Sequence, residues 1–500
     1  MSVDARAAGR AVSSDASAQR LKKGQLTLPN CVALSAALMA PVLAVLLNAP
    51  AAASSSQGAL PLSFLIAFIG IAFVANTVVQ FSRRLPSSGL FYNYVSHGLG
   101  GGAGFYTGWL YFAAYILIVV GLFTANGAFL HGYLVSEFSV NVPWWILSLA
   151  LLGLVFTFSL RSVKASVRVD LTLLIFEMLV FTVLGVIAIV KGGSGNTLHY
   201  FSTTASSKGI GGIGLGAIFG ILSFVGFEAA ATLGEETRNP RRNIPAAIFG
   251  ATAIIGVFYV FQMYALSAGY RLNEPHQLVA FMGDANPFAT LAHRYASWMT
   301  NIIDIAGVFG LFSCLLASQN ATVRVIFSMG RDRVLPGRLG GVHQRFHSPY
   351  VAIFVLTGLT IVIGVPLAIW LGSSTTDVYG WTGSIATVGI VLVYMLGNVA
   401  LIRYFWKDPE RSILKHVVFP IIGIVALAYP VYSTAKPNQS YPYNLVFWVV
   451  IAWLILGVIA YYYLKTRAPQ KLEAVGRILA EDEEDLSEGR LPAGAVNADT

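Results

Sequence analysis

Apolar runs of about 20 residues recur along the chain, and they constrain its fold more than any other feature. A helix of this length crosses the roughly 30 Å hydrocarbon core of a bilayer. The runs are continuous and do not alternate at every second residue, which excludes a membrane barrel. Charged residues make up only 11% of the 500 residues, against about 25% in an ordinary soluble protein. The sequence therefore predicts an all-α polytopic membrane protein.

The apolar runs predict twelve transmembrane helices. Their expected ranges are 29–49, 60–81, 103–133, 143–160, 168–190, 211–233, 245–269, 297–329, 349–371, 379–404, 416–434 and 443–464. The third and eighth spans exceed the thickness of a bilayer, so we expect them to tilt or to extend beyond it. The first span also imitates a cleavable signal peptide, but the many later spans favour a transmembrane helix.

The positions of the basic residues predict the orientation of these spans. If the N-terminus is cytoplasmic, 27 of the 32 Lys and Arg residues fall on the cytoplasmic side. This asymmetry follows the positive-inside rule, so we expect a multi-pass protein of the cell membrane with both termini in the cytoplasm. The same asymmetry accounts for the net charge of +9, so no nucleic-acid partner is needed to explain it. The expected environment of the chain is the lipid bilayer.

Signatures of soluble enzymes are absent from the sequence. It contains no Walker loop, no HExxH and no GxSxG in a strand–turn–helix setting. The glycine-rich "GIGGIGLGAIFG" over 209–220 follows no strand, so its glycines favour close helix packing. Cys31 and Cys314 lie in apolar runs without metal-ligand spacing, and the eight histidines are scattered. We therefore expect neither an enzyme nor a cofactor or metal, and no polar rings indicate a channel.

Two of the expected spans contain residues that interrupt helices. Pro41 lies in the middle of the first span and removes a backbone hydrogen bond, and the sixth span carries six glycines, with Gly226 as the last. Broken backbone at membrane depth is tolerated where it lines a cavity or is buried in protein. A half-helix that begins at such a break presents N–H groups that suit a carboxylate. If the chain consists of two five-helix repeats, these spans correspond, which is the pattern of a transporter site. A proline kink and ordinary glycine packing remain the alternative.

Four segments resemble the amino acid–polyamine–organocation (APC) permeases. They are "SFVGFEAAATLGEETRNPRRNIPAAI" from 223, "RRLPSSGLFYNYVSHGLG" from 83, "SVKASVRVD" from 162 and "QNATVRVIFSMGRDRVLP" from 319. The resemblance implies a LeuT/APC-like 5+5 inverted repeat followed by two further helices, and secondary transport of amino acids or related amines.

With this resemblance, the expected organisation has five parts. They are a disordered cytoplasmic segment 1–24, a first repeat 25–190, a second repeat 191–404, a helix pair 405–465 and an acidic disordered tail 466–500.

The resemblance also assigns residues to a substrate site. In the first break, where many family members carry a Gly-Ser-Gly type sequence, this chain has Ala37, Met39, Ala40 and Pro41. The break in the sixth helix consists of Ser223, Phe224, Val225, Gly226 and Phe227. Tyr115 is expected at the wall of the site, and Ser318 on the eighth helix is a further candidate for substrate binding. A substrate carboxylate would be held by backbone N–H groups without help from a hydroxyl in the first break.

Three buried polar residues are candidates for coupling or gating. An acid within the membrane is a functional candidate by default, and Glu228 lies just beyond the sixth-helix break. Glu177 falls where some proton-coupled relatives carry a lysine in place of a sodium ion, which makes it a candidate proton site. Ser313, with Ser318, could instead ligate sodium. Each acid could also simply hold helices together by hydrogen bonds, and each serine could bond to its own helix.

The loop over 234–245 predicts an ion-pair network. Glu235 and Glu236 are expected to pair with Arg238, Arg241 and Arg242 at the cytoplasmic end, either as a gate or as a topological anchor. Pro245 is expected early in the seventh helix. Asp304 is expected to face an outer vestibule, and Arg324 is expected to extend to water.

Two functions of different class remain open. The first is a permease that moves an amino acid by alternating access, coupled to protons or by exchange, with polyamines as the alternative substrate. The second is a membrane sensor that binds such a molecule without transporting it. The expected partners are therefore a small amino acid or amine and a coupling proton, with sodium as the other possibility.

Overall fold

The chain folds into helices throughout the part that the structure describes. The computed structural model describes residues 24–85, 89–161, 163–284, 286–371, 375–434, 441–467 and 469. Within these ranges, β-type pairing is limited to one isolated bridge between Leu26 and Thr237. The all-α class is therefore confirmed for these residues. The expectations for residues 1–23 and 470–500 lie outside the described part.

The first half of the chain begins with an interrupted helix and continues with long ones. The elements are α2 (Leu28–Leu38), α3 (Pro41–Leu43), the π-helix η1 (Ala44–Asn48), α4 (Ala49–Ser56), η2 (Gln57–Ala59), α5 (Leu60–Arg84), α6 (Phe91–Leu99), α7 (Gly101–Phe138), α8 (Trp144–Arg161) and α9 (Val163–Lys191).

The second half begins with a second interrupted helix. After the short turns η3 to η5 (Gly193–Gly195, Leu198–Phe201, Thr203–Ala205) come α10 (Gly209–Ser223), the 3₁₀-helix η6 (Ala229–Leu233), α11 (Pro240–Tyr270), α12 (Pro275–Met282), α13 (Pro287–Tyr295), η7 (Ser297–Met299), α14 (Thr300–Arg331), η8 (Gly337–Gly340), α15 (Tyr350–Trp370), α16 (Thr375–Tyr404), η9 (Leu414–Val418), α17 (Phe419–Thr434), η10 (Tyr443–Leu445) and α18 (Val446–Arg467).

Many of these helices are long and apolar enough to cross a membrane. In the described ranges, nine helical stretches meet that condition when Leu28–Arg84 is counted as one, and Gly209–Ser223 and Leu414–Tyr429 are shorter apolar helices. Apolar side chains such as Val362, Ile369 and Trp448 are exposed on the outer helices. A surface of this kind suits contact with lipid. The chain is therefore a multi-pass membrane protein.

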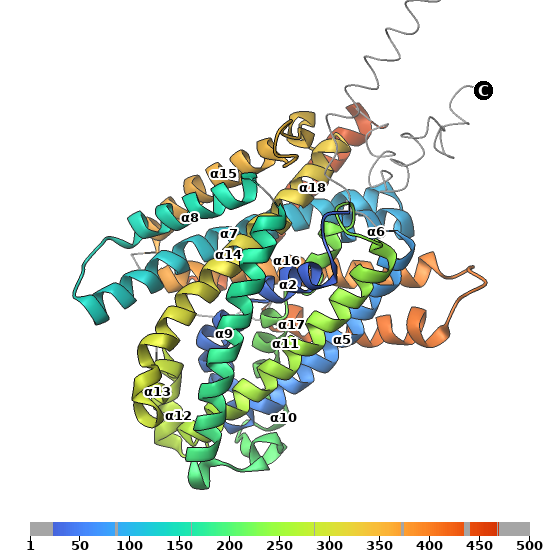
Figure 1. Cartoon of the computed structure of the whole chain (residues 1–500). Helices are drawn as coiled ribbons and strands as arrows, with labels where there is room; N and C mark the ends of the chain where they lie inside the picture. Colours follow the sequence, from blue (N-terminus) through green and yellow to red (C-terminus); the bar gives the residue numbers. More distant parts are fainter. Residues whose placement is uncertain are drawn as a thin grey trace, which may run out of the picture.

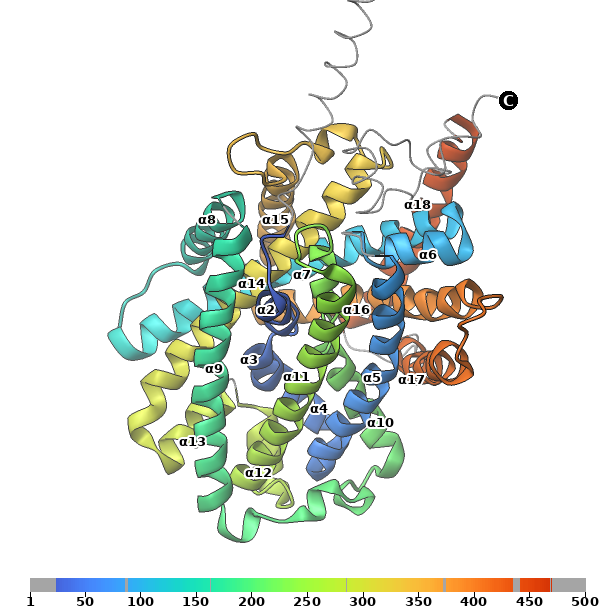
Figure 2. The same ribbon diagram turned by 45° about the vertical axis from the view of Figure 1, so that its right-hand side comes forward.

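The interrupted helix occupies the middle of the bundle. Helix α2 packs against α9, α11 and α14, which surround it, and α3 continues from it toward α4 (Figure 1, Figure 2). Helix α7 packs along α14 and α16, and α5 packs along α11. Helices α12 and α13 lie at the opposite end of the bundle from the connection between α14 and α15 (Figure 1). The interruption between α2 and α3 is therefore enclosed by protein, whereas the first residues of α2 are exposed.

The last helix is tied to the bundle by a pair of tryptophans. The indole rings of Trp109 on α7 and Trp453 on α18 stack with centroids 4.5 Å apart. Each indole N–H donates to the carbonyl oxygen of the other residue, at 2.9 and 3.1 Å. Because both polar groups are satisfied within the protein, this contact is stable away from water.

Several helices differ from the sequence-based expectation. Helix α11 begins at Pro240 rather than at 245, so Pro245 lies inside the helix. The reason is local, since a proline at the first helical position has no N–H to leave unsatisfied. Helices α6, α12 and α13 were not anticipated at all. They are only 8 or 9 residues long, and a search for long apolar runs does not detect short helices.

Candidate functional site

The first interruption lies between α2 and α3. Helix α2 ends at Leu38, and Ala40 adopts a left-handed conformation with φ 50° and ψ 64° before α3 begins at Pro41. Such a conformation costs a residue with a Cβ about 1–2 kcal/mol. Pro41 has no N–H to continue the ladder from α2. The strained residue and the proline together explain why this span is broken here and not elsewhere.

The second interruption lies between α10 and η6. Helix α10 ends at Ser223, and the backbone turns through 224–228 before a short 3₁₀-helix begins at Ala229. Gly226 has a φ of 103°, and a Cβ added to it would lie 2.5 Å from Cγ of Leu38. A glycine at this position is therefore what allows the two interruptions to approach each other.

Tyr259 of α11 joins the two interruptions. Its hydroxyl oxygen lies 2.5 Å from the carbonyl oxygen of Met39 and 2.9 Å from that of Ser223. The hydroxyl has one proton, so it can donate to either of these carbonyls but not to both at once. The tyrosine is completely buried. It therefore offers a partner to carbonyls that the broken helices leave without an intrahelical donor.

Two further hydrogen bonds connect the interrupted spans. The backbone N–H of Ala230 in η6 donates to Oγ of Ser35 in α2 at 2.8 Å. The amide of Asn48, at the end of η1, donates to Oγ of Ser223 at 2.9 Å. The halves of the two spans are therefore paired, α2 with η6 and η1 with α10.

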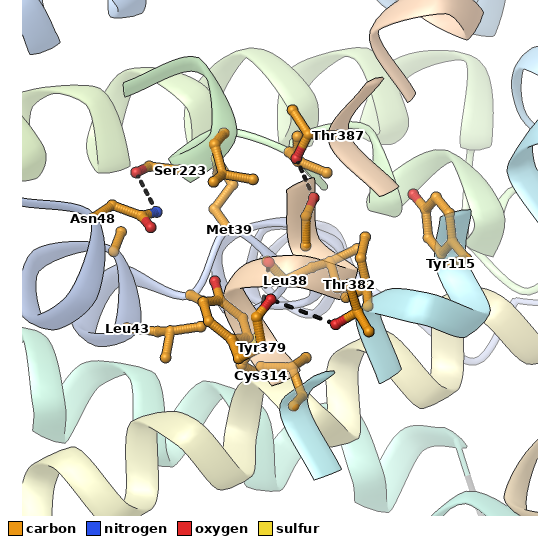
Figure 3. A pocket seen from close by; sticks show the side chains of 17 residues that line it. Leu38, Met39, Leu43, Asn48, Tyr115, Ser223, Cys314, Tyr379, Thr382 and Thr387 are labelled. Carbon is orange, nitrogen blue, oxygen red and sulfur yellow. Dashed lines mark hydrogen bonds between the residues drawn. The ribbon is translucent and has the colours of Figure 1, made fainter. Parts of the chain in front are cut away.

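A small cavity lies where these elements meet, and we call it the central cavity. Its volume is about 50 Å³, which is room for roughly three to five water molecules. Figure 3 shows the side chains around it. The lining consists of Leu38, Met39, Ala40, Leu43, Ala44, Asn48, Tyr115, Ile118, Leu122, Leu222, Ser223, Val225, Cys314, Tyr379, Thr382, Gly383 and Thr387. The wall is mainly apolar, with neutral polar groups and no charged side chain.

The structure brings only part of the expected substrate residues to this cavity. Those that line it are Met39, Ala40, Tyr115, Ser223 and Val225. Those that lie in or next to the interruptions without lining it are Ala37, Pro41, Phe224, Gly226 and Phe227. Ser318 lies one helical turn below the cavity, with Oγ 3.9 Å from Sγ of Cys314.

Sequence reasoning missed the contribution of α16. Tyr379, Thr382, Gly383 and Thr387 all reach the central cavity from this helix, at a spacing that places them on one face. Hydroxyl residues repeated on one face of an apolar span are a signal that could have identified them. Cys314 was expected only to pack, yet it lines the cavity.

Glu228 is held by three tyrosines. It is completely buried, and its Oε1 accepts hydrogen bonds from Tyr111 and Tyr115 of α7, each at 2.8 Å. Its Oε2 accepts a hydrogen bond of 2.6 Å from Tyr394 of α16. Both carboxylate oxygens therefore have partners, and the residue ties the start of η6 to α7 and α16.

Glu177 has a very different environment. It is 1% exposed, and neither of its carboxyl oxygens has a hydrogen-bond partner. Its Oε2 is packed so closely on Gly310 of α14 that any Cβ there would clash with it, and the same glycine faces Val42 of α3. A charge buried without a partner is costly, so this side chain is unlike an ordinary structural acid.

A second acid lies near Glu177 on the same helix. Asp170 is completely buried, its Oδ1 lies 3.4 Å from Oγ of Ser313, and its Oδ2 has no partner. Residues seven apart fall on one face of a helix, so α9 presents two acids to α14. The sequence analysis had named Glu177 and Ser313 but not Asp170.

The end of the bundle near the α14–α15 connection is closed by buried ion pairs, which we call the latch. Nε of Arg324 lies 2.7 Å from Oε1 of Glu236, and the guanidinium of Arg331 forms two bonds of 2.9 Å with Glu235. Arg324 is only 4% exposed. The expectation that it extends to water was therefore wrong, because a carboxylate compensates its charge inside the protein.

The latch uses partners that the sequence did not indicate. Both arginines lie on α14, about 90 residues further along the chain than the acids (88 and 96). Arg238 lies in the same loop as the acids, and Arg241 and Arg242 lie in the first turn of α11. Arg238 instead donates from its side chain to the carbonyl of Gly24. The latch therefore joins two separate elements.

The opposite end of the bundle contains a larger cavity, which we call the outer cavity. Its volume is about 500 Å³, and it is lined by α3, η1, α7, α13 and α14. Leu43 lines both this cavity and the central one. Asp304 also lines it and accepts a 2.7 Å hydrogen bond from Asn286.

Metal ligands are not gathered anywhere in the described ranges. No group of three or more His, Cys, Asp or Glu side chains there is arranged to hold a metal ion.

Comparison with known proteins identifies the family. The family model described as "Amino acid permease" matches residues 26–462. The chain is 25% identical over 440 residues to the branched-chain amino acid permease BcaP of Bacillus subtilis, covering 83% of this chain and 87% of that protein. It is 25% identical over 432 residues to the methylthioribose transporter of the same organism, covering 82% and 87%.

A third relative transports an amine. The chain is 24% identical over 369 residues to the low-affinity putrescine importer PlaP of Escherichia coli, covering 71% of this chain and 76% of that protein. The chain therefore belongs to the amino acid permease family, among the APC permeases that its sequence motifs resemble.

Proposed function

We propose that this protein is a secondary active transporter that moves a small amino acid across the cell membrane by alternating access. The observation that carries the proposal is the meeting of two interrupted helices at the central cavity, with Tyr259 touching the carbonyls of both. Interrupted helices of this kind form the substrate sites of transporters with internal repeats.

The proposal includes a full topology. The interrupted helices α2–α4 and α10–η6 serve as the first and sixth of twelve membrane spans, the first ten forming a 5+5 inverted repeat (25–190 and 191–404) and the last two a separate pair (405–465). Both termini lie in the cytoplasm, so the latch faces the cytoplasm and the outer cavity faces outward. In support, the broken helices of the two halves follow the same plan: a helical segment (α2 or α10), a break, and a further helical segment.

An amino acid fits the central cavity better than a polyamine does. A polyamine has two cationic groups, and in the described residues no carboxylate lines the cavity. Glu228 is next to it, but both of its oxygens accept from tyrosines. Val42 and Leu43 follow Pro41 at helix positions whose N–H groups ordinarily have no intrahelical partner, and these suit a substrate carboxylate. Carbonyls near the interruptions suit its ammonium group.

The apolar wall selects the side chain of that amino acid. Leu38, Leu43 and Leu222 line the cavity together with other aliphatic residues. A cavity of about 50 Å³ is smaller than ordinary ligand sites of about 300–1,000 Å³. Binding therefore requires the walls to separate, and the expected substrate has a small aliphatic side chain.

The proposed coupling ion is the proton, with Glu177 as its binding group. Glu177 lies against Gly310, and that glycine contacts Val42 directly after the first interruption. A proton on Glu177 neutralises a buried charge at the contact between α3 and α14. The loss of this charge favours close packing of the two helices. Ser313 and Asp170 are proposed as the neighbouring groups that receive or deliver this proton.

Uptake into proteoliposomes tests the transport function. We expect radiolabelled leucine or alanine to accumulate in vesicles containing the protein, and excess unlabelled small aliphatic amino acids to compete. Putrescine in equal excess is expected to compete poorly. Binding without any uptake would identify a sensor instead, and competition by putrescine alone would favour the polyamine reading.

The pH dependence of uptake tests the coupling. In wild type, we expect uptake to rise as the external pH falls, because protonation of Glu177 precedes closure. The Glu177→Gln variant mimics the protonated acid, so its uptake or exchange should become nearly independent of pH. A variant that keeps the full pH dependence would exclude Glu177 as the coupling group.

A further inference from the structure

The latch end of the bundle contains a pocket that the transport cycle does not explain. It has a volume of about 170 Å³ and lies between the end of α8, the start of α9, the inner part of α14 and the segment before α15. We call it the basic pocket. Its lining includes Arg161, Lys164, Arg324, Arg345 and His347, with Glu236 as the one acid.

The charge balance of the basic pocket is strongly positive. Glu236 is already paired with Arg324 at 2.7 Å. In the described ranges, no carboxylate lies within ion-pair distance of Arg161, Lys164 or Arg345. Three exposed cationic side chains therefore line the pocket without a counter-charge from the described residues, and an anion bound among them would reduce their mutual repulsion.

Neutral hydrogen-bonding groups complete the pocket. Ser159, Asn320 and Ser348 line it, and Asn320 and Ser348 are buried. The segment with Ser348 leads into the 21-residue helix α15 at Tyr350, whose first N–H groups and positive dipole end favour an anion. The donors of Ser159, Asn320 and Ser348 are already used within the protein, by Asn320, Ser166 and the carbonyl of Leu160 respectively. The groups left to hold an anion are therefore the cationic side chains and the start of α15.

We propose that the basic pocket binds a phosphate group. Guanidinium groups match the geometry of phosphate oxygens and form paired, charge-assisted hydrogen bonds with them. The pocket lies between helix ends on the side proposed to be cytoplasmic, and basic pockets in such places accept the headgroups of anionic lipids. The phosphate is carried either by an anionic lipid of the inner leaflet or by a free phosphate compound.

The position of Glu236 connects this pocket to the latch. Arg324 and Glu236 line the pocket and also form part of the latch. When the segment after η6 moves away to open this end, Arg324 loses its counter-charge, and a bound phosphate replaces it. A ligand that binds one state more tightly shifts the population toward that state. Phosphate in the basic pocket therefore favours the state in which the latch is open.

Thermal unfolding of the full-length protein in detergent tests the proposal. The ligands are dioctanoyl phosphatidylglycerol, dioctanoyl phosphatidylcholine and inorganic phosphate, each titrated against the unfolding midpoint, because a ligand that binds the folded state raises it. We expect a saturable increase with phosphatidylglycerol that exceeds the increase with phosphatidylcholine. An increase with inorganic phosphate as well would indicate that the phosphate alone suffices; an increase with the lipid only would identify the lipid headgroup as the ligand.

Matched variants locate the effect in the pocket. We expect the double variant Lys164→Gln/Arg345→Gln to raise the dissociation constant for phosphatidylglycerol at least about tenfold. The control Lys407→Gln/Arg338→Gln removes the same charges from exposed positions outside the pocket and should leave it within about twofold of wild type. The variant Glu236→Gln removes the carboxylate that competes with the ligand for Arg324. This variant should therefore bind the same ligand more tightly than wild type.

Three results would overturn the proposal. They are no saturable shift in wild type with either anionic ligand, equal shifts with the anionic and the zwitterionic lipid, and unchanged affinity in the Lys164/Arg345 variant. Should that double variant fail to fold, as judged by its elution from a sizing column, Lys164→Gln alone and the opposite effect of Glu236→Gln decide the matter. None of these measurements requires transport, so their failure is separate from failure of the proposed function.

Discussion

The two ends of the molecule differ in how far they are closed. At the latch end, two buried ion pairs join α14 to the segment after η6, and Tyr92 donates a 2.8 Å hydrogen bond to Asp332. At the other end, a cavity of about 500 Å³ reaches Leu43 at the edge of the central cavity. The difference indicates a state that is closed on the latch side and nearly open on the other.

The buried ion pairs suit the latch end to opening and closing. A buried ion pair adds little to stability compared with apolar residues, but losing one partner is costly. Such a pair therefore suits a switch, because its two charges are stable either when they are paired inside the protein or when they are separated and exposed to water. Around the outer cavity, by contrast, Asp304 relies on one hydrogen bond from Asn286, which is a much weaker restraint.

The largest expected effect comes from breaking the latch. Arg324→Met leaves Glu236 buried without a counter-charge, which costs about 3–5 kcal/mol and should open that end. Cys31 reports on it, because it is completely buried and lies 3.2 Å from the hydroxyl of Thr237, directly after Glu236. We expect alkylation of Cys31, followed by peptide mapping, to become at least about tenfold faster.

An exposed ion pair provides the control for this variant. Arg84 lies 3.5 Å from Asp408 but is 41% exposed, and exposed pairs contribute about 0–1 kcal/mol. Arg84→Met should therefore leave the alkylation of Cys31 unchanged. Equal rates in the Arg84 and Arg324 variants would show that the latch does not hold this end closed.

The next effect concerns Gly226, in the interruption between α10 and η6. In Gly226→Ala, the new Cβ would meet Leu38 and the backbone would be strained at a φ of 103°. Such strain costs about 1–3 kcal/mol, and we expect uptake to fall at least about tenfold while the protein still folds. Gly211→Ala is the control, since a Cβ at Gly211 meets nothing within 4 Å, and it should transport like wild type.

A smaller effect is expected from the bridge between the interruptions. Tyr259→Phe removes the hydroxyl that touches the carbonyls of Met39 and Ser223, and losing one hydrogen bond costs about 1 kcal/mol. We expect a several-fold lower uptake rate with a folded protein of slightly lower unfolding midpoint. Unchanged uptake would show that movement between the two ends does not depend on this contact.

The weakest restraint should be the one at the outer end. Asn286→Ala removes the hydrogen bond to Asp304, whose side chain is 8% exposed. A bond to a carboxylate is worth about 1.5–3 kcal/mol when fully buried, and less where water reaches it. We expect faster alkylation of Cys314 in the central cavity but no change at Cys31. A change at Cys31 instead would reverse the assignment of the two ends.

The sequence predicted the local features of this structure well. Pro41 and Gly226 determine the backbone at their own positions, so the interruptions could be located without knowing any tertiary contact. The long helices followed from apolar length alone. Short helices such as α12 and α13 were missed because their stability depends on packing against the bundle and not on their own composition.

Side-chain partners were much harder to predict. Glu228 was recognised as an unusual acid, but Tyr394 is 166 residues away along the chain. Nothing local to Glu236 indicated that Arg324 would be its partner, 88 residues away. Such pairs depend on how helices are arranged in space, and a single sequence does not contain that arrangement in readable form.

Protection of Cys314 offers the most direct test of where the substrate binds. Cys314 is 2% exposed and lines the central cavity between the two interruptions. A small methanethiosulfonate reagent would be added from the outer side of proteoliposomes, with and without a saturating concentration of the transported amino acid. We expect the substrate to slow modification of Cys314 at least about tenfold. Modification at the same rate with and without substrate, in a protein that transports it, would contradict a binding site in this cavity.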